Sequence, residues 1–162
     1  MAFQPEGNLT AYRLADERYP IFDGGGAMLL GGRWNSPGRR VIYAALTFAG
    51  AMLEVLVHTN TGRVPTHHAY IEISIPATVP VERLDVSTVP GWDAPGYAVS
   101  RAVGNAWYDS GRSAVLVVPS VVSQVDSNVL IHQEHPNFLQ IQASEPRPVR
   151  WDRRLFRDDG WE

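Results

Sequence analysis

The sequence predicts an α+β domain in which a mixed sheet carries a few helices. Three observations favour this class: short apolar segments typical of strands, two segments with helical spacing, and no regular alternation of strand and helix. The 162 residues fit one domain better than two. We expect a lead-in over residues 1–10 and one folded unit over residues 11–157.

The first elements follow one another closely along the chain. A short strand is expected at residues 12–14. Residues 23–40 are rich in glycine, and we expect a loop there because glycine weakens helices and strands alike. The apolar run at 41–45 predicts a buried strand. Thr47 is then expected to be the N-cap of a helix that ends near His58.

The helix after Thr47 has two contrasting sides. Apolar residues recur on one side, and we expect Leu53 and Val57 to lie beside it. The other side carries small and polar residues, including Gly50 and Ala51. Glu54 is expected to project from this second side.

The second half of the chain is expected to supply most of the sheet. Isoleucine alternates with polar residues at 69–75, which predicts a strand with one buried face. Residues 80–93 are rich in proline, aspartate and glycine, which favour turns, and we expect no strand there. Beyond them we expect a helix over 95–109 and strands at 114–118, at 128–131 and around Val149.

The composition narrows the possible functions. A net charge of −3 gives no general attraction to nucleic acid. The absence of cysteine excludes disulfides, thiolate zinc sites and cysteine nucleophiles. No apolar run approaches the roughly 20 residues that span a bilayer, and the N-terminus has no signal-peptide pattern. We therefore expect a cytoplasmic protein that contacts no membrane and does not itself bind nucleic acid.

The glycine-rich segment 31–38 is the first candidate site. Gly32 lets the backbone approach a ligand closely, and the planar fork of Arg33 suits phosphate oxygens. Trp34 would stack on an aromatic ligand, and Asn35 would bind a hydroxyl or an amide. The alternative, which local features alone favour, is a tight turn whose arginine pairs with a surface carboxylate.

Four more residues are candidates, each with a simpler alternative. A carboxylate at Glu54 would stabilise a cationic sugar, although most glutamates on such helices face solvent. Ser120 follows a buried strand and would orient a ligand, or bind only its own turn. Tyr43 and Arg13 are either ligand contacts or partnered strand residues. The spacing of the histidines does not fit a metal site, and we expect no bound metal ion.

Taken in order, these segments resemble the RES-domain family. The likeness covers about residues 11–155 and rests on the segments 12–13, 31–35, 41–43, 53–58 and 117–120. The family takes its name from an Arg, a Glu and a Ser, and the matching residues are Arg33, Glu54 and Ser120. Residues 128–136 depart from the family pattern, with His132-Gln133 where Asn-Pro is frequent, and we assign this segment no role.

The resemblance implies a fold similar to ADP-ribosyltransferase toxins and NAD⁺ as the substrate. It implies a toxin that cleaves the nicotinamide–ribose bond as a glycohydrolase or phosphorylase, thereby depleting cellular NAD⁺. It also implies an Xre-type helix-turn-helix antitoxin as partner. Two alternatives stay open: a protein ADP-ribosyltransferase, and a non-catalytic module that binds NAD⁺ or ADP-ribose. A metal hydrolase ranks third.

These implications give each candidate residue an expected role. Arg33 would hold the pyrophosphate, with Arg13 in support. Glu54 would stabilise the ribosyl cation or polarise the acceptor. Tyr43 and Ser120 would place the nicotinamide and its ribose, while the pocket would be shaped by Gly32, Trp34 and Asn35.

Overall fold

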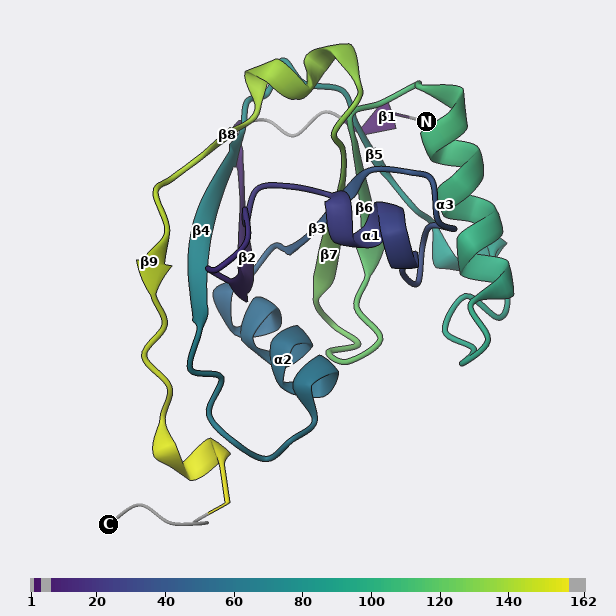
Figure 1. Ribbon diagram of the computed structural model, residues 1–162. Helices are drawn as coiled ribbons and strands as arrows, with labels where there is room; N and C mark the ends of the chain where they lie inside the picture. Colours follow the sequence, from purple (N-terminus) through teal and green to yellow (C-terminus); the bar gives the residue numbers. More distant parts are fainter. Residues whose placement is uncertain (1, 4–6, 158–162) are drawn as a thin grey trace.

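A mixed sheet organises the part of the chain that the computed structural model describes, residues 2–3 and 7–157 (Figure 1). Only β5 and β6 pair in parallel; the other pairings are antiparallel. The α+β class is thereby confirmed. The strands lie in the order β1 (Ala2–Phe3), β5 (Val81–Arg83), β6 (Val115–Pro119), β7 (Ser127–His132), β3 (Val41–Ala45), β2 (Leu9–Asp16), β4 (His68–Ile75) and β8 (Gln142–Ala143), with β9 (Arg147–Pro148) also on β4.

The sheet divides into two halves between β2 and β3. β2 pairs with β4 along its whole length, whereas β2 and β3 share the single pair Tyr12 and Ala45. The side chain of Arg13 fills the gap, because its Nη1 donates to the carbonyl oxygen of Tyr43 at 2.8 Å. In Figure 1, β2 and β4 accordingly lie to the left of β3, β7 and β6.

The α-helices lie against this sheet. In Figure 1, α3 (Ala98–Ser110) stands beside β5 and β6, α2 (Phe48–Thr59) lies below, and α1 (Gly25–Leu30) crosses in front of β6 and β7. Separate apolar clusters pack beneath α3 and α2, and a third, larger cluster is built mainly from strand residues. Short 3₁₀ turns occupy Val86–Thr88, Pro136–Gln140 and Arg153–Leu155.

The loop expected over residues 23–40 contains a short helix, so that expectation is wrong in part. Helix α1 begins directly after Asp23 and Gly24, and the Asp23 carboxylate accepts the N–H of Gly25 at 3.0 Å. The glycines lie only in its first turn, while the residues that follow, Ala-Met-Leu-Leu, are good helix formers. An acidic residue at the start therefore compensates for the glycine-rich beginning.

Helix α2 confirms the expected cap but corrects the expected faces. The Thr47 hydroxyl accepts the N–H of Gly50 at 2.9 Å, as an N-cap should. However, Leu53 and Val57 are exposed, whereas Gly50 and the neighbouring Ala51 are buried. The small residues let the helix lie close to the sheet, so Gly50 and Ala51 join the buried side. The apolar side is buried as expected at Val55, whereas Leu53 and Val57 beside it face solvent.

The remaining elements mostly follow the expectations. The strands expected at 69–75, 114–118 and 128–131 are confirmed. The helix expected over 95–109 is confirmed as well, with bounds Ala98–Ser110. Residues 80–93 were expected to form only turns, yet β5 pairs there with β6 because Val81 is fully buried in the core. The edge strand expected around Val149 lies just before it, as β9, and β2 begins earlier than expected, at Leu9.

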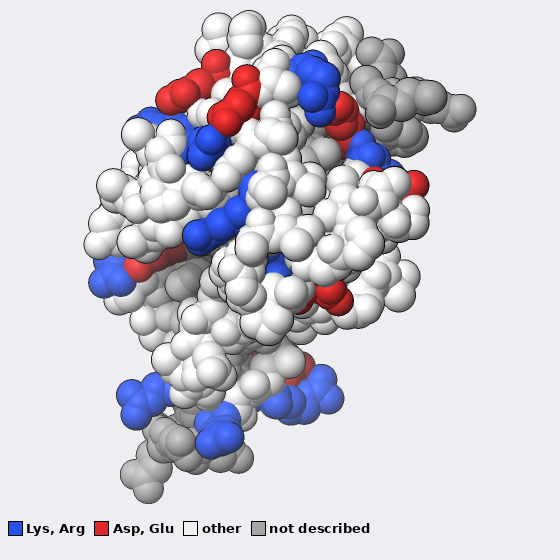
Figure 2. All heavy atoms as spheres, turned by 90° about the vertical axis from the view of Figure 1, so that its right-hand side faces the viewer, with Lys and Arg blue, Asp and Glu red and all other residues white. Residues whose placement is uncertain are grey.

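Part of the expected lead-in, residues 1 and 4–6, lies outside the described residues. Within the described ranges no helix is both long enough and apolar enough to cross a bilayer. Figure 2, which views the molecule from the side of α3, shows acidic and basic side chains scattered among uncharged ones, with basic groups gathered towards the lower end.

Candidate active site

A half-buried carboxylate on α2 is the first part of the site. Glu54 follows Gly50 by one helical turn and lies on the side of α2 that meets the sheet. The N-terminus of the helix is fixed to the loop between β6 and β7, because Thr47 also donates its hydroxyl hydrogen to Asp126. Glu54 is therefore carried by a helix that is held at both its cap and its buried face.

Two neutral donors converge on one oxygen of this carboxylate. Ser120 Oγ donates to Glu54 Oε1 at 3.2 Å, and Asn128 Nδ2 donates to the same oxygen at 2.9 Å. Ser120 is 2% exposed, and its oxygen accepts the N–H of Ser123 at 3.0 Å. That bond directs the serine hydroxyl hydrogen towards Glu54. We call Glu54, Ser120 and Asn128 the carboxylate cluster.

The second part of the site is a tight turn over residues 31–36, here called the arginine loop. Gly31 has φ +73, and Gly32 N–H donates to the carbonyl oxygen of Asn35 at 2.9 Å. A methyl group on Gly32 would lie 2.6 Å from the hydroxyl oxygen of Tyr43. The turn therefore requires a glycine at position 32 so that the tyrosine can approach its backbone.

Tyr43 joins the arginine loop to the sheet. Its hydroxyl donates to Asn35 Oδ1 at 2.6 Å and accepts the N–H of Trp34 at 3.1 Å. Burial raises the pKa of Tyr43 far above its ordinary value, although Arg101 and Arg33 oppose that shift. The tyrosine is therefore a neutral hydrogen-bonding group at any physiological pH.

Trp34 and Asn35 are interior residues in this structure. Trp34 is 3% exposed and stacks on Trp92, with ring centroids 6.1 Å apart. Asn35 is fully buried, and its Nδ2 donates to the carbonyl oxygens of Ala27, Ser36 and Arg39. Both side chains hold the loop in place from within.

Helix α3 fastens the arginine loop from the other side. Arg101 Nε donates to the carbonyl oxygen of Gly32 at 2.8 Å, and Ser100 Oγ donates to that of Arg33 at 2.6 Å. Asn105 makes two hydrogen bonds with Ser36. The helix approaches so closely that a methyl group on Gly104 would lie 1.7 Å from the Trp34 carbonyl oxygen.

The Arg33 side chain points away from its own turn towards the start of α3. Its guanidinium lies 4.5 Å from the centre of the Tyr97 ring, and its Nη1 donates to the Ala94 carbonyl oxygen at 3.2 Å. Arg101 lies 5.6 Å from the same ring. Among the ion pairs of the described residues, neither Arg33 nor Arg101 has a carboxylate partner. Two cations thus flank one ring without neutralisation, an arrangement suited to an anionic ligand.

Arg13 has a more internal position. Besides its bond to Tyr43, its Nε donates to the carbonyl oxygen of Ile21 at 2.8 Å. Burial lowers the pKa of Arg13, and the charge of Asp23 acts in the opposite direction. Arg13 therefore holds the division between the two halves of the sheet.

Asn128 of the carboxylate cluster and Tyr43, which binds the arginine loop, lie on the same face of the sheet. Asn128 lies opposite Ala45, and Tyr43 lies opposite Leu130. Since alternate residues of a strand share a face, Tyr43 and Asn128 are diagonal neighbours, about 7–8 Å apart. In the described residues, however, no hydrogen bond joins the Arg33 guanidinium to Glu54, because Arg33 Nη1 donates instead to Ala94, in the loop before α3.

Sequence reasoning missed several residues that build this region. Asn128 was placed in a strand without a role, although its alternation with Leu130 puts it on the same face as Tyr43. Ser100, Arg101 and Asn105 gave no local signal, because each acts on a loop that is more than sixty residues away in sequence.

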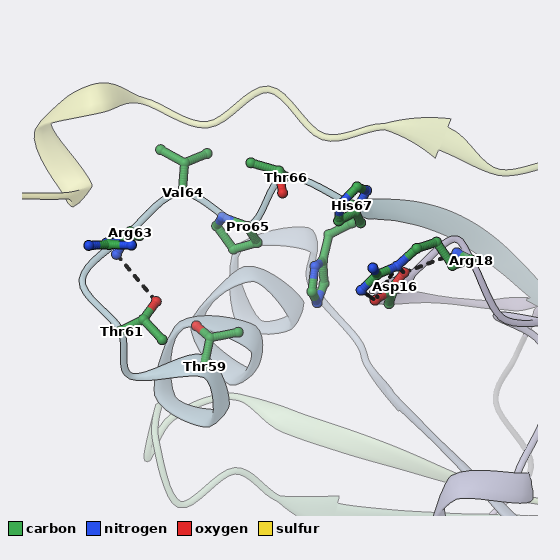
Figure 3. A pocket seen from close by; sticks show the side chains of 10 residues that line it. Asp16, Arg18, Thr59, Thr61, Arg63, Val64, Pro65, Thr66 and His67 are labelled. Carbon is green, nitrogen blue, oxygen red and sulfur yellow. Dashed lines mark hydrogen bonds and ion pairs between the residues drawn. The ribbon is translucent and has the colours of Figure 1, made fainter. Parts of the chain in front are cut away.

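A separate hollow of about 230 Å³ lies at the C-terminal end of α2. Figure 3 shows that it is lined by side chains of the loop after α2 and by Asp16 and Arg18, which form an ion pair. None of the residues predicted from the sequence lines it. Within the described residues, no group of three His, Asp or Glu side chains is placed to hold a metal ion.

Comparison with known proteins adds a family and several relatives. The profile of the RES domain family matches residues 10–152. A Sphingobium protein named Prs ADP-ribosylating toxin is 40% identical over 139 residues, which cover 83% of this chain and 86% of the relative. A Pseudomonas putida protein named Toxin Res is 36% identical over 142 residues, with 85% and 94% covered.

A solved structure shares the fold. A chain from the crystal structure of the M. tuberculosis MbcT–MbcA toxin–antitoxin complex superposes with a TM-score of 0.75. It covers 91% of this chain and 86% of its own length, at 19% sequence identity. At that identity the likeness shows the architecture alone.

Proposed function

Because this chain belongs to the RES domain family, we propose that it is the toxin of a toxin–antitoxin pair and cleaves NAD⁺ at the nicotinamide–ribose bond. The carboxylate cluster carries the proposal. It offers one negative charge on a rigid helix, beside a sheet face that also holds Tyr43. Cleavage of this bond leaves a cationic ribose, which such a carboxylate stabilises.

The reaction needs little help with the leaving group, since nicotinamide departs as a neutral molecule. The enzyme has to hold the dinucleotide, stabilise the ribosyl cation and admit an acceptor. We assign the second task to Glu54. Ser120 directs its hydroxyl hydrogen to Glu54 and so acts as a positioning group, and its burial gives it no part as a nucleophile.

We assign the first task, holding the dinucleotide, to the arginine loop. Arg33 is the proposed pyrophosphate ligand, because its charge has no carboxylate partner among the described residues and it lies at the surface end of the loop. Arg13 supports the site by holding the sheet division open. Gly32, Trp34, Asn35 and Tyr43 hold the loop in shape. We also assign Tyr43 to the nicotinamide end of the substrate, as the family resemblance implies.

The acceptor decides the product. Water gives a glycohydrolase, inorganic phosphate gives a phosphorylase, and we rank these two first. A second candidate is transfer of ADP-ribose to a protein side chain. The name of the Sphingobium relative, an ADP-ribosylating toxin, favours this second candidate.

The proposed partner is an Xre-type helix-turn-helix antitoxin. The fold neighbour was solved in a toxin–antitoxin complex, which supports an antitoxin partner. The net charge of −3 fits a chain that leaves contact with operator DNA to its partner. We place the protein in the cytoplasm, where NAD⁺ and the partner gene product are available.

The experiment incubates purified protein with NAD⁺, with and without phosphate, and follows nicotinamide release and the ribose product. ADP-ribose alone indicates water as acceptor, and a phosphorylated product that appears only with phosphate indicates a phosphorylase. Labelling of a protein target with little free product indicates the transferase. Tight binding of NAD⁺ without any turnover contradicts the proposal and leaves a binding module.

A further inference from the structure

We propose that Asn128 is a positioning residue that selects which oxygen of Glu54 does the chemistry. Asn128 and Ser120 both donate to Oε1, at 2.9 Å and 3.2 Å. Among the hydrogen bonds of the described residues, none reaches Oε2. The inference rests on the proposed function, because it takes Glu54 as the group that meets the ribosyl cation.

The donor at position 128 has a rigid base. β7 lies between β3 and β6, and Asn128 pairs with Ala45 on one side and with Val118 on the other. A side chain from a doubly paired central strand has little freedom of movement. The amide orientation is also determined, because only the NH₂ end of an asparagine donates to a carboxylate.

The donor at position 120 has a determined direction. The Ser120 oxygen accepts the Ser123 N–H, so its own hydrogen is left for Glu54. A glutamate on a helix surface normally samples several rotamers. Two directed donors on one oxygen remove that freedom and leave Oε2 as the oxygen with lone pairs available to substrate.

A purely structural role is the competing explanation, since Asn128 also satisfies a half-buried carboxylate. A structural role lowers the free energy of unfolding and leaves the kcat of the folded enzyme unchanged, whereas a positioning role lowers the kcat of a variant that is still folded. An Asn128→Asp change adds a pH dependence to the kcat that the positioning role predicts. At neutral pH it places two carboxylates in contact, and they repel one another. At lower pH a single proton held between them restores a donor to Oε1, so a positioning role predicts recovery of kcat.

The test measures kcat and KM for NAD⁺ cleavage from pH 5 to pH 8 in Asn128→Asp and Asn128→Ala. At neutral pH we expect kcat to fall about tenfold to a hundredfold in both variants, with KM within about threefold of wild type. Only Asn128→Asp is expected to recover as the pH falls. Asn137→Asp, the same chemical change beyond the far end of β7, is the control and should follow wild type throughout.

A third variant, Asn128→Ser, keeps a short donor and should recover part of the kcat that alanine loses, which guards against misfolding of the aspartate variant. A uniform loss at every pH, or unchanged kcat in Asn128→Ala, overturns the proposal. Glu54→Gln is measured alongside. If wild type does not cleave NAD⁺, the proposed function fails. If wild type is active and Glu54→Gln stays equally active, the role assigned to Glu54 fails and the Asn128 proposal fails with it, so the two failures are distinguishable.

Discussion

The carboxylate cluster and the arginine loop are built in opposite ways. In the cluster, neighbouring side chains hold the charged group itself, so Glu54 is positioned atom by atom. In the loop, hydrogen bonds from α3 hold the backbone, and Trp34 and Asn35 are buried beneath it. The Arg33 guanidinium extends to the surface. The first arrangement suits a group that must meet a transition state, and the second suits a group that captures a flexible anion.

Within the arginine loop itself, some residues hold the loop in shape and another is available to a ligand. Gly32, Trp34 and Asn35 stand beside Arg33 in the sequence, yet their contacts are all with the protein. We therefore infer that these three residues hold the loop in shape and that Arg33 is the residue of the motif that meets the ligand.

The largest effect is expected where α3 meets the arginine loop. Gly104→Ala places a methyl group 1.7 Å from the Trp34 carbonyl oxygen, so the helix or the loop must move. We expect a loss of about 3 kcal/mol in the free energy of unfolding, from overpacking. Chemical denaturation measures it. Gly96→Ala, where nothing lies within 4 Å, is the matched control and should change little.

Arg33→Ala should separate binding from stability. The side chain is held by one hydrogen bond and a cation–π contact near the surface, so unfolding should be almost unaffected. We expect KM for NAD⁺ to rise about tenfold to a hundredfold from loss of a charged phosphate contact, with kcat changing much less. Arg39→Ala, which removes an ion pair with Asp109, is the control. A fall in kcat at unchanged KM would contradict the assignment.

Tyr43→Phe tests the link between the sheet and the loop. It removes one hydroxyl that serves both Asn35 and Trp34. We expect a loss of about 1–2 kcal/mol in the free energy of unfolding, with a rise in KM because the loop loosens. Tyr19→Phe, at a position that is 70% exposed, should have neither effect. If Tyr43→Phe is as stable as wild type, the hydrogen bonds from α3 alone hold the arginine loop.

The smallest effect is a pH dependence at the C-terminal end of α3. His132 is buried, its Nε2 meets the Tyr108 carbonyl oxygen and its Nδ1 accepts the Glu134 N–H. Burial, and then the charge of His135, lowers the pKa of His132. The unfolded chain therefore takes up the proton first, so the contribution is complete above about pH 6.5 and declines as the pH falls below it.

Urea midpoints at pH 5 to 8 measure this dependence. Wild type should lose stability from pH 7 to pH 5 more steeply than His132→Gln. The other titratable groups around the ring, Tyr108, Asp109, Glu134 and His135, remain in both proteins, so the difference between the two curves reports His132. Parallel curves would show that His132 does not contribute.

Part of this architecture could be predicted from the sequence because its signals are local. Thr47 indicates the start of α2 with ordinary capping chemistry, and the alternation at 69–75 predicts β4. The family resemblance supplied Glu54 and Ser120 as site residues, but the hydrogen bond between them is known only from the structure. The division of the sheet by Arg13 could not be predicted, since an arginine side chain that replaces a ladder bond looks like any strand arginine.

The burial of the motif residues could not be predicted either. A tryptophan in a glycine-rich loop has the same sequence context whether it stacks on a ligand or on Trp92. Likewise, the spacing of Gly50 and Ala51 groups them with the polar residues of α2. Both are buried in the structure, because their small size lets the helix approach the sheet. In both cases the deciding contact comes from a distant segment.

The most direct test compares binding with turnover in Glu54→Gln. We expect this variant to bind NAD⁺ with a Kd within about threefold of wild type, by calorimetry, while single-turnover nicotinamide release falls at least about a hundredfold. Release at the wild-type rate would contradict the account. So would a loss of binding large enough to explain the whole loss of rate.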